Sequence, residues 1–312
     1  MTNSIKLYSD FPELIDNTSR DAFLSCPTKW QRQVIQKLAP IHTSKDLHFG
    51  GAFAMGLETI RRSFYEQNLS QGESLFRGVV EATKFYGNYE PPENHAKNYE
   101  TLIHGLYSYV ERYPLATDYI TPIALPSGKR AVEFTFAVPI PEVIHPQTGN
   151  PILYGGRFDM IGKFQNTIFG LDDKTTGQLG PSWSKQWDLN SQITGYSWAA
   201  GMSGFPLAGM VVRGQSILKN SFGFAEVVEY RPQWQIDRWL DQLVTDVKRM
   251  IEVWKKGHYD MNLASSCNSY GGCKFMTLCK SREPEKWLEG EYKNHFWNPL
   301  AKDPEAIPEG LK

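Results

Sequence analysis

The chain has 312 residues, of which 41% are apolar and 21% charged, so its composition is that of a globular protein with a sizeable core. Its 33 basic and 34 acidic residues nearly cancel, which argues against an architectural nucleic-acid binder but not against an enzyme with a local basic groove. No apolar run reaches the roughly 18–20 residues of a membrane span, and the N-terminal residues lack the features of a secretory signal. We therefore expect a cytoplasmic protein with no membrane partner.

The first half of the chain predicts helices. Apolar residues recur with helical spacing over 18–38, and residues 48–67 are expected to form a glycine-rich turn that leads into a second helix. Two further helices are expected at about 74–85 and 97–113, on either side of a proline-containing turn. We expect residues 60–130, approximately, to be a helical insertion into the domain.

In the middle of the chain the period of the apolar residues changes to two, which predicts strands. Strands are expected at 132–140, 152–164, 167–176, 209–217 and 224–230. Helices are expected at about 187–200 and 232–256, followed by a cysteine-bearing loop at 262–280 and an extended tail at 281–312. This order of elements predicts a mixed α/β fold in which residues 1–280 form a single domain.

The stretch GRFDMIGKFQNTIFGLDDKTT combines two expected strands with several charged residues. A two-residue turn at Gln165–Asn166 places Asp159 opposite Asp172, where two carboxylates on one face repel each other unless a cation offsets the repulsion. Lys174 follows Asp172 by two residues and so projects from the same face, while Asp173 points to the other. Alternation alone therefore gathers Asp159, Asp172 and Lys174 at one place.

Two interpretations of this hairpin remain open. Its charges either face solvent, as they usually do for an isolated Asp-x-Lys in a strand, or they form a cation site. The apolar flanks favour a buried strand, in which unpaired charge is costly, and therefore favour the cation site. Downstream, Gln192 and Tyr196 share a face of an expected helix, which by itself indicates no more than a polar contact.

Together, these residues resemble the motifs of the PD-(D/E)XK nuclease superfamily, in its RecB-like branch. The motifs of that branch are G-x-x-D, D/E-x-K-T and Q-x-x-x-Y. This chain has Gly156-Arg-Phe-Asp159, Asp172-Asp-Lys-Thr175 and Gln192-Ile-Thr-Gly-Tyr196 in the same order. The resemblance implies a restriction-endonuclease-like fold, which is a mixed sheet core flanked by helices.

The resemblance also implies a role for each residue of the site. Asp159 and Asp172 would hold Mg²⁺ or Mn²⁺, and the backbone carbonyl of Asp173 would complete the protein ligands. Lys174 would orient or activate the attacking water. The scissile phosphate, or the surroundings of the metal, would be steadied by Gln192 and Tyr196.

The first core helix departs from the family pattern. Many RecB-like enzymes have a histidine in the context G-x-x-F-H-x-G-L-E, and the sequence GGAFAMGLE has Ala54 at that position. Glu58 remains and is expected to contribute a metal ligand or a water-mediated contact. His48, just upstream, is either a substitute for the histidine or a surface residue unrelated to the site.

The chain has only four cysteines, three of which follow a C-x5-C-x5-C pattern: Cys26, Cys267, Cys273 and Cys279. Structural zinc sites usually have paired C-x2-C ligands, which are missing here. Three close thiolates and a distant fourth fit a [4Fe–4S] cluster. The arrangement, with CPTKW around Cys26, resembles the iron–sulfur clamp of AddB-type and CRISPR-associated RecB-like nucleases, which joins the N- and C-terminal parts. Four ordinary buried cysteines are the alternative.

The sequence therefore predicts a Mg²⁺- or Mn²⁺-dependent DNA exonuclease that hydrolyses phosphodiester bonds in recombination, repair or replication. DNA ends or single strands are the expected substrate, and a recombinase, a single-strand-binding protein or a helicase is the expected partner. A phage-encoded enzyme of this kind would act in the host cytoplasm. Two alternatives stay open: a non-catalytic or weakly active iron–sulfur DNA-binding scaffold of the same fold, and a zinc-stapled protein with an unrelated α/β core.

Overall fold

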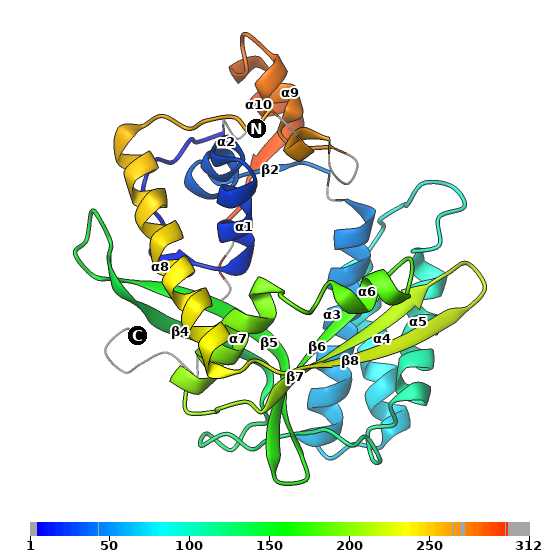
Figure 1. Cartoon of the computed structure of the whole chain (residues 1–312). Helices are drawn as coiled ribbons and strands as arrows, with labels where there is room; N and C mark the ends of the chain where they lie inside the picture. The colour runs from blue at the N-terminus through cyan, green and yellow to red at the C-terminus, as the bar shows by residue number, and fades with distance from the viewer. Residues whose placement is uncertain (1–4, 43, 264, 269–271, 297, 299–312) are drawn as a thin grey trace.

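The computed structural model describes residues 5–42, 44–263, 265–268, 272–296 and 298. Its centre is a seven-stranded mixed sheet (Figure 1), which confirms the mixed α/β class and adds two short strands to the five that the sequence predicted. Five strands follow one another across it: β1 (Leu14–Ile15), β5 (Pro151–Phe164), β6 (Thr167–Thr176), β7 (Gly209–Ile217) and β8 (Phe222–Glu229). The other edge of β5 pairs with β3 (Thr121–Pro122) and β4 (Val132–Ile144). The β1–β5 and β6–β7 pairs are parallel, and the others are antiparallel.

Helices lie on both faces of this sheet (Figure 1). One layer, with its own apolar core, consists of α3 (Lys45–Tyr65), α4 (Gln71–Tyr86) and α5 (Tyr99–Arg112). The other layer packs on β4 and β5 and consists of α1 (Asn17–Ser25), α7 (Ser191–Met202) and α8 (Gln233–Lys256). Shorter segments are α2 (Pro27–Trp30), a π-helix (Gln31–Ile35) and α6 (Pro181–Lys185). Among the helices of the described ranges, none has the length and apolarity that a membrane crossing requires.

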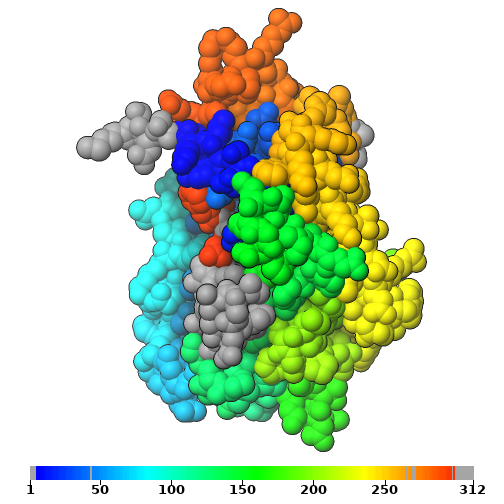
Figure 2. All heavy atoms as spheres, turned by 90° about the vertical axis from the view of Figure 1, so that its left-hand side faces the viewer, coloured from blue at the N-terminus to red at the C-terminus, as the bar shows by residue number. Residues whose placement is uncertain are grey.

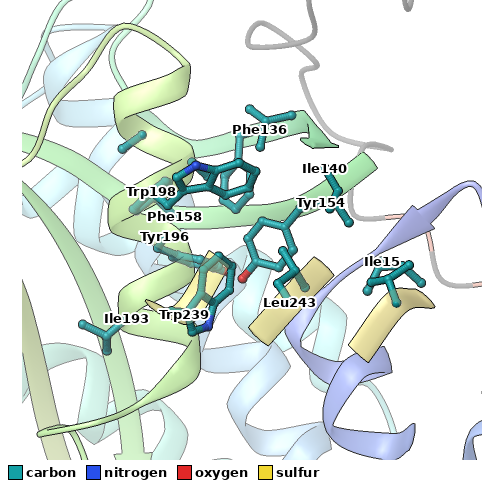
Figure 3. Close-up of a cluster of buried hydrophobic side chains, with 14 of the residues drawn as sticks. Ile15, Phe136, Ile140, Tyr154, Phe158, Ile193, Tyr196, Trp198, Trp239 and Leu243 are labelled. Carbon is teal, nitrogen blue, oxygen red and sulfur yellow. The ribbon is translucent and has the colours of Figure 1, made fainter. Parts of the chain in front are cut away.

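The core between the sheet and the second layer is rich in aromatic side chains (Figure 3). Tyr154 of β5 packs edge-on against Trp239 of α8, with ring centroids 5.2 Å apart. Tyr196 of α7 packs against Phe158 of β5, with ring centroids 4.7 Å apart. Because these large rings interlock, α7 is fixed over β5, and this places the end of α7 that carries Gln192 beside the hairpin.

α3 begins earlier than expected, so the prediction of a glycine-rich turn is wrong. Ser44 accepts a hydrogen bond from the Leu47 amide and caps the helix. Gly50 and Gly51 then lie inside α3, although glycine in a helix interior costs about 1 kcal/mol relative to alanine. Close packing explains at least one of them, since a Cβ on Gly51 would lie 3.0 Å from the Phe85 ring of α4.

The two ends of the described chain meet in a small lobe (Figure 1), where Figure 2 shows the dark blue N-terminal segment on the same face as the orange segment. Its elements are β2 (Leu38–Pro40), a 3₁₀ turn (Ser265–Cys267), α9 (Met276–Lys280), α10 (Glu285–Glu291) and β9 (Tyr292–Asn294). β2 pairs antiparallel with β9, and Leu38, Phe275, Leu278 and Tyr292 form a small core. The structure therefore corrects the expected extended tail at residues 285–294, because the strand pairing and the core bury apolar side chains there. Residues 299–312 lie outside the described residues.

Candidate active site

The β5–β6 hairpin pairs in the predicted register. Its ladder runs from Phe164 opposite Thr167 to Met160 opposite Leu171. This last pair is adjacent to Asp159, which is itself not paired with β6 in the ladder. Beyond this point β5 continues beside β4, and β6 continues beside β7. The two strands of the hairpin therefore stop pairing at the place where the predicted site residues begin.

The three predicted residues of the hairpin meet at this place. Asp159 Oδ2 accepts a hydrogen bond of 2.6 Å from the backbone N–H of Asp173. Asp172 Oδ2 lies 2.7 Å from Lys174 Nζ, which confirms that these two side chains project from one face of β6. The Asp172 side chain is 4% exposed and the Lys174 side chain 34%, so the carboxylate is enclosed while the ammonium reaches solvent.

Gln192 and Tyr196 reach the hairpin from α7. Gln192 Nε2 donates to Asp172 Oδ1 at 3.3 Å, so this side chain orients a site carboxylate directly. The Tyr196 hydroxyl accepts a hydrogen bond of 3.3 Å from the backbone N–H of Arg157, two residues before Asp159. Burial, helped by the charge of Asp172, raises the pKa of Tyr196 to about 12, so the hydroxyl stays protonated near neutral pH. Tyr196 therefore holds the backbone of β5.

The charges of the site are unevenly matched. Burial raises the pKa of Asp159 well above its ordinary value, and the charges of Asp172 and Glu133 raise it further. Burial also raises the pKa of Asp172, against the opposing effect of Lys174. Burial alone would lower the pKa of Lys174, but Asp172 and Asp159 outweigh it and raise that pKa, so the ammonium stays charged. Asp172 pairs with Lys174 and Glu133 with Arg157, so a further cation would offset the charge of Asp159.

Glu133 of β4 is a site residue that the sequence analysis missed. The residues on either side of it pair with those on either side of Asp159, so the two acidic residues face each other across the strands. Glu133 is 4% exposed and has a positive φ of 53°. Its carboxylate lies 2.5 Å from Arg157 Nε. The available signal was a single acidic residue in the apolar run VEFTFAVPI.

Asp173 points to the opposite face of β6, as predicted, and there contacts two residues that the sequence analysis also missed. Asp173 Oδ1 accepts a hydrogen bond of 2.5 Å from the Tyr109 hydroxyl of α5. Asp173 Oδ2 lies 2.7 Å from Arg61 Nη2 of α3. Arg61 Nη2 also donates to the Tyr109 hydroxyl at 3.0 Å. These residues come from three elements far apart in the chain, and no short spacing in the sequence connects them.

A cavity of about 460 Å³ opens beside these groups. Its walls include Ala54 and Arg61 of α3, Glu133 of β4, Asp159 of β5, and Asp173 and Lys174 of β6. Ala54 thus faces the cavity at the position where the motif has histidine. Glu58 and His48 are not among the described residues that line it. Glu58 forms an ion pair of 3.2 Å with Arg62, and His48 Nε2 lies 2.9 Å from a backbone carbonyl of α4.

In the part of the chain that the structure describes, no three His, Cys, Asp or Glu side chains form a group that could hold a metal ion as they stand. The Lys174 ammonium is the counter-charge of Asp172 in this arrangement. The chemistry of the donors nevertheless fits a hard divalent cation, because such ions prefer carboxylate and carbonyl oxygens. The carboxylates of Asp172 and Glu133 lie close enough to Asp159 to raise its pKa, in addition to the larger effect of its burial.

The four cysteines are half-buried free thiols. Cys26, between α1 and α2, accepts a hydrogen bond of 3.5 Å from the backbone N–H of Asn262. Cys267 Sγ donates to the Asn262 carbonyl at 3.6 Å, and the Cys273 amide donates to the Cys267 carbonyl at 2.8 Å. Burial raises the pKa of Cys279, and the charges of Cys273 and Cys26 add to this increase. Cys26 therefore contacts the segment that carries the other three cysteines, but the described thiols do not form a group that could hold a metal ion as they stand.

The chain matches the family model of the PD-(D/E)XK nuclease superfamily over residues 18–280. A search of the curated proteins finds no match. A crystal structure from Eubacterium rectale, described as a "putative exonuclease", is similar to 82% of this chain and 86% of its own, with 10% identity and a TM-score of 0.52. The structure of SSO0001 covers 73% of this chain and 84% of its own, with 14% identity and a TM-score of 0.30. At such identity, the first likeness shows the fold alone. The match over residues 18–280 shows that the chain belongs to the PD-(D/E)XK nuclease superfamily.

Proposed function

We propose that this chain is a Mg²⁺- or Mn²⁺-dependent deoxyribonuclease, an exonuclease of the RecB-like branch that hydrolyses phosphodiester bonds at DNA ends or in single strands. The observation that carries the proposal is the meeting of Asp159, Asp172 and Lys174 where the β5–β6 ladder ends. Two acidic side chains and a charged lysine beside a cavity are the groups that metal-assisted hydrolysis requires.

Asp159, Asp172 and the backbone carbonyl of Asp173 would hold the cation, with Glu133 as a further carboxylate on the neighbouring strand. When bound, such an ion lowers the pKa of water and polarises the phosphoryl group. The raised pKa of Asp159 supports this assignment, because a carboxyl group that repels its neighbours gains most from a nearby cation. Glu58 drops out of the proposed ligand set, since its side chain pairs with Arg62.

The other side chains position these groups and complement the charge of the phosphate. The Lys174 ammonium would donate hydrogen bonds to the attacking water or to a phosphate oxygen. Gln192 keeps Asp172 in orientation through its hydrogen bond to Oδ1, and Tyr196 keeps β5 in place through the Arg157 amide. Groups that are fixed before the reaction need no reorganisation as charge develops on the phosphate.

The finer assignment to an exonuclease is supported by the resemblance of the Gly156–Asp159, Asp172–Thr175 and Gln192–Tyr196 motifs to those of the RecB-like branch. An enzyme that acts on DNA ends would take part in recombination, repair or replication. It would receive its substrate from a recombinase, a single-strand-binding protein or a helicase. A structural [4Fe–4S] cluster on Cys26, Cys267, Cys273 and Cys279 is supported by the absence of C-x2-C pairs in the sequence and by the contacts of Cys26 and Cys267 with Asn262.

The proposal is tested by incubating the purified protein and Mg²⁺ or Mn²⁺ with one DNA sequence in two forms, end-labelled linear and closed circular. We expect the linear form to be shortened from its ends, the circular form to persist, and a chelator to stop the reaction. Equal cleavage of the two forms would indicate an endonuclease. Failure to cleave either form with either metal would favour the non-catalytic scaffold, the alternative to which Ala54 in the cavity wall points.

A further inference from the structure

The middle residue of the Asp-x-Lys motif is itself an aspartate whose side chain is buried. Asp173 lies between Asp172 and Lys174, and its side chain is 8% exposed under the α3–α5 layer. A carboxylate in such a place is costly unless it is paired and hydrogen-bonded. A different residue type at this position would pack against the helices without that cost, so the contacts that Asp173 makes call for an explanation.

Asp173, Arg61 and Tyr109 form a closed ring of polar contacts. Asp173 receives a hydrogen bond from Tyr109 on one carboxylate oxygen and pairs with Arg61 on the other, while Arg61 donates to the Tyr109 hydroxyl. Each member contacts both of the others, and the three come from β6, α3 and α5. The ring therefore fixes the side chain of Asp173 to two helices at once.

The backbone of Asp173 belongs to the candidate active site, whose cavity is lined by Arg61 and Asp173 as well as by Asp159 and Lys174. Its N–H donates to Asp159 Oδ2 at 2.6 Å. Its two neighbours in the chain, Asp172 and Lys174, form the ion pair of the site. A shift of the backbone at this residue would therefore move three side chains of the site together.

We propose that Arg61 and Tyr109 are positioning residues, which hold the Asp173 side chain so that its backbone keeps Asp159, Asp172 and Lys174 in the arrangement that binds the cation. This inference rests on the proposed nuclease function. It explains why the helical layer is linked to the sheet by polar contacts at this residue, in addition to its own apolar core.

Tyr109→Phe tests the inference, because it removes the hydroxyl that contacts both other members and keeps the ring that packs in the core. We expect the Mn²⁺ affinity of the DNA-free protein, measured by calorimetry, to fall about tenfold to a hundredfold, as for other groups that orient metal ligands. Cleavage at low Mn²⁺ should show a lower kcat with an unchanged KM for DNA. Saturating Mn²⁺ should restore most of the kcat.

Tyr65→Phe is the matched control. The Tyr65 hydroxyl lies in the same helical layer and donates to the Leu115 carbonyl at 2.8 Å instead of to a residue of β6. We expect this variant to lose stability without any change in Mn²⁺ affinity. A Tyr109→Phe protein that melts earlier but binds Mn²⁺ as tightly as the wild type would overturn the inference and leave a purely structural ring.

A second pair of variants covers the case in which Tyr109→Phe does not fold. Arg61→Met should weaken Mn²⁺ binding, and Arg61→Lys, which keeps the charge, should restore part of it. Equal Mn²⁺ affinity in these two variants and the wild type would overturn the inference. A wild type that neither binds Mn²⁺ nor cleaves DNA would remove the proposed nuclease function instead, so the two failures are distinguishable.

Discussion

Glu133 and Asp159 face each other across β4 and β5, because the residues on either side of them are paired in the ladder. Each is also connected to a backbone or side-chain donor of the site, Glu133 to the Arg157 guanidinium and Asp159 to the Asp173 amide. Glu133 therefore adds a third acidic side chain to a site for which the sequence motifs supply two, Asp159 and Asp172. The energetics of the site therefore depend on all three acidic groups.

Glu133→Gln should weaken divalent-metal binding and slow cleavage, because it removes a carboxylate beside Asp159. Since Glu133 is a neighbour of the proposed ligands rather than a member of the motif, we expect a loss of about tenfold to a hundredfold. Titration calorimetry with Mn²⁺ and a cleavage assay at several Mn²⁺ concentrations measure it. Unchanged Mn²⁺ affinity would show that Glu133 takes no part in metal binding.

Asp159→Asn should stabilise the metal-free protein at neutral pH. The pKa of Asp159 is raised in the folded state, so the folded protein binds this proton more tightly than the unfolded chain. The free energy of unfolding therefore falls as the pH rises from about 4 through the folded-state pKa, and the asparagine variant lacks this fall.

Thermal unfolding between pH 4 and pH 8 without metal measures the effect. The melting temperature of the variant should exceed that of the wild type at pH 8, and the difference should shrink toward pH 4. Added Mn²⁺ should raise the melting temperature of the wild type only. Asp237→Asn on the exposed face of α8 is the control. Parallel pH curves for wild type and Asp159→Asn would contradict the account.

Ala54→His should tighten Mn²⁺ binding, because residue 54 faces the cavity and imidazole nitrogen is a good ligand for transition metals. Glu58→Gln, one helical turn further along α3, is the comparison, since Glu58 pairs with Arg62. We expect the first variant to bind Mn²⁺ more tightly and the second to bind it unchanged. The reverse result would place Glu58 at the metal and Ala54 away from it.

Anaerobically purified protein should be brown and contain about four irons per chain. Cys26→Ser should lose iron and melt earlier, as should the same change at Cys267, Cys273 or Cys279, because one cluster would use all four thiolates. The colour should survive Asp159→Asn, which serves as the control. A colourless protein with one zinc per chain would replace the iron assignment, and unchanged iron in Cys26→Ser would remove Cys26 from the cluster.

Local sequence rules predicted the hairpin because its determinants are local. The period of two places Asp172 and Lys174 on one face, and the turn at Gln165–Asn166 sets the register; both predictions are confirmed. The same rules placed Asp159 directly against Asp172. They missed that the ladder ends first, so that Asp159 contacts the backbone of β6.

The contacts that the sequence did not predict join elements far apart in the chain. Glu133 is brought to Asp159 by the pairing of β4 with β5, and its positive φ interrupts the regular alternation on which a strand prediction depends. Arg61 and Tyr109 reach Asp173 only because α3 and α5 pack on the sheet. Gly51 lies inside a helix because α4 approaches it closely, which local propensity does not show.

We propose that the Asp172 carboxylate and the Lys174 ammonium act together in metal-dependent DNA cleavage. The most direct test compares the wild type with Asp172→Asn and Lys174→Met on end-labelled DNA with Mn²⁺, after circular dichroism has shown that all three are folded. Cleavage should fall at least about a hundredfold in each variant, since removing a metal ligand or a catalytic cation costs at least as much as removing a group that orients one. Cleavage by either variant at the wild-type rate, or equal cleavage by the wild type with and without chelator, would contradict the claim.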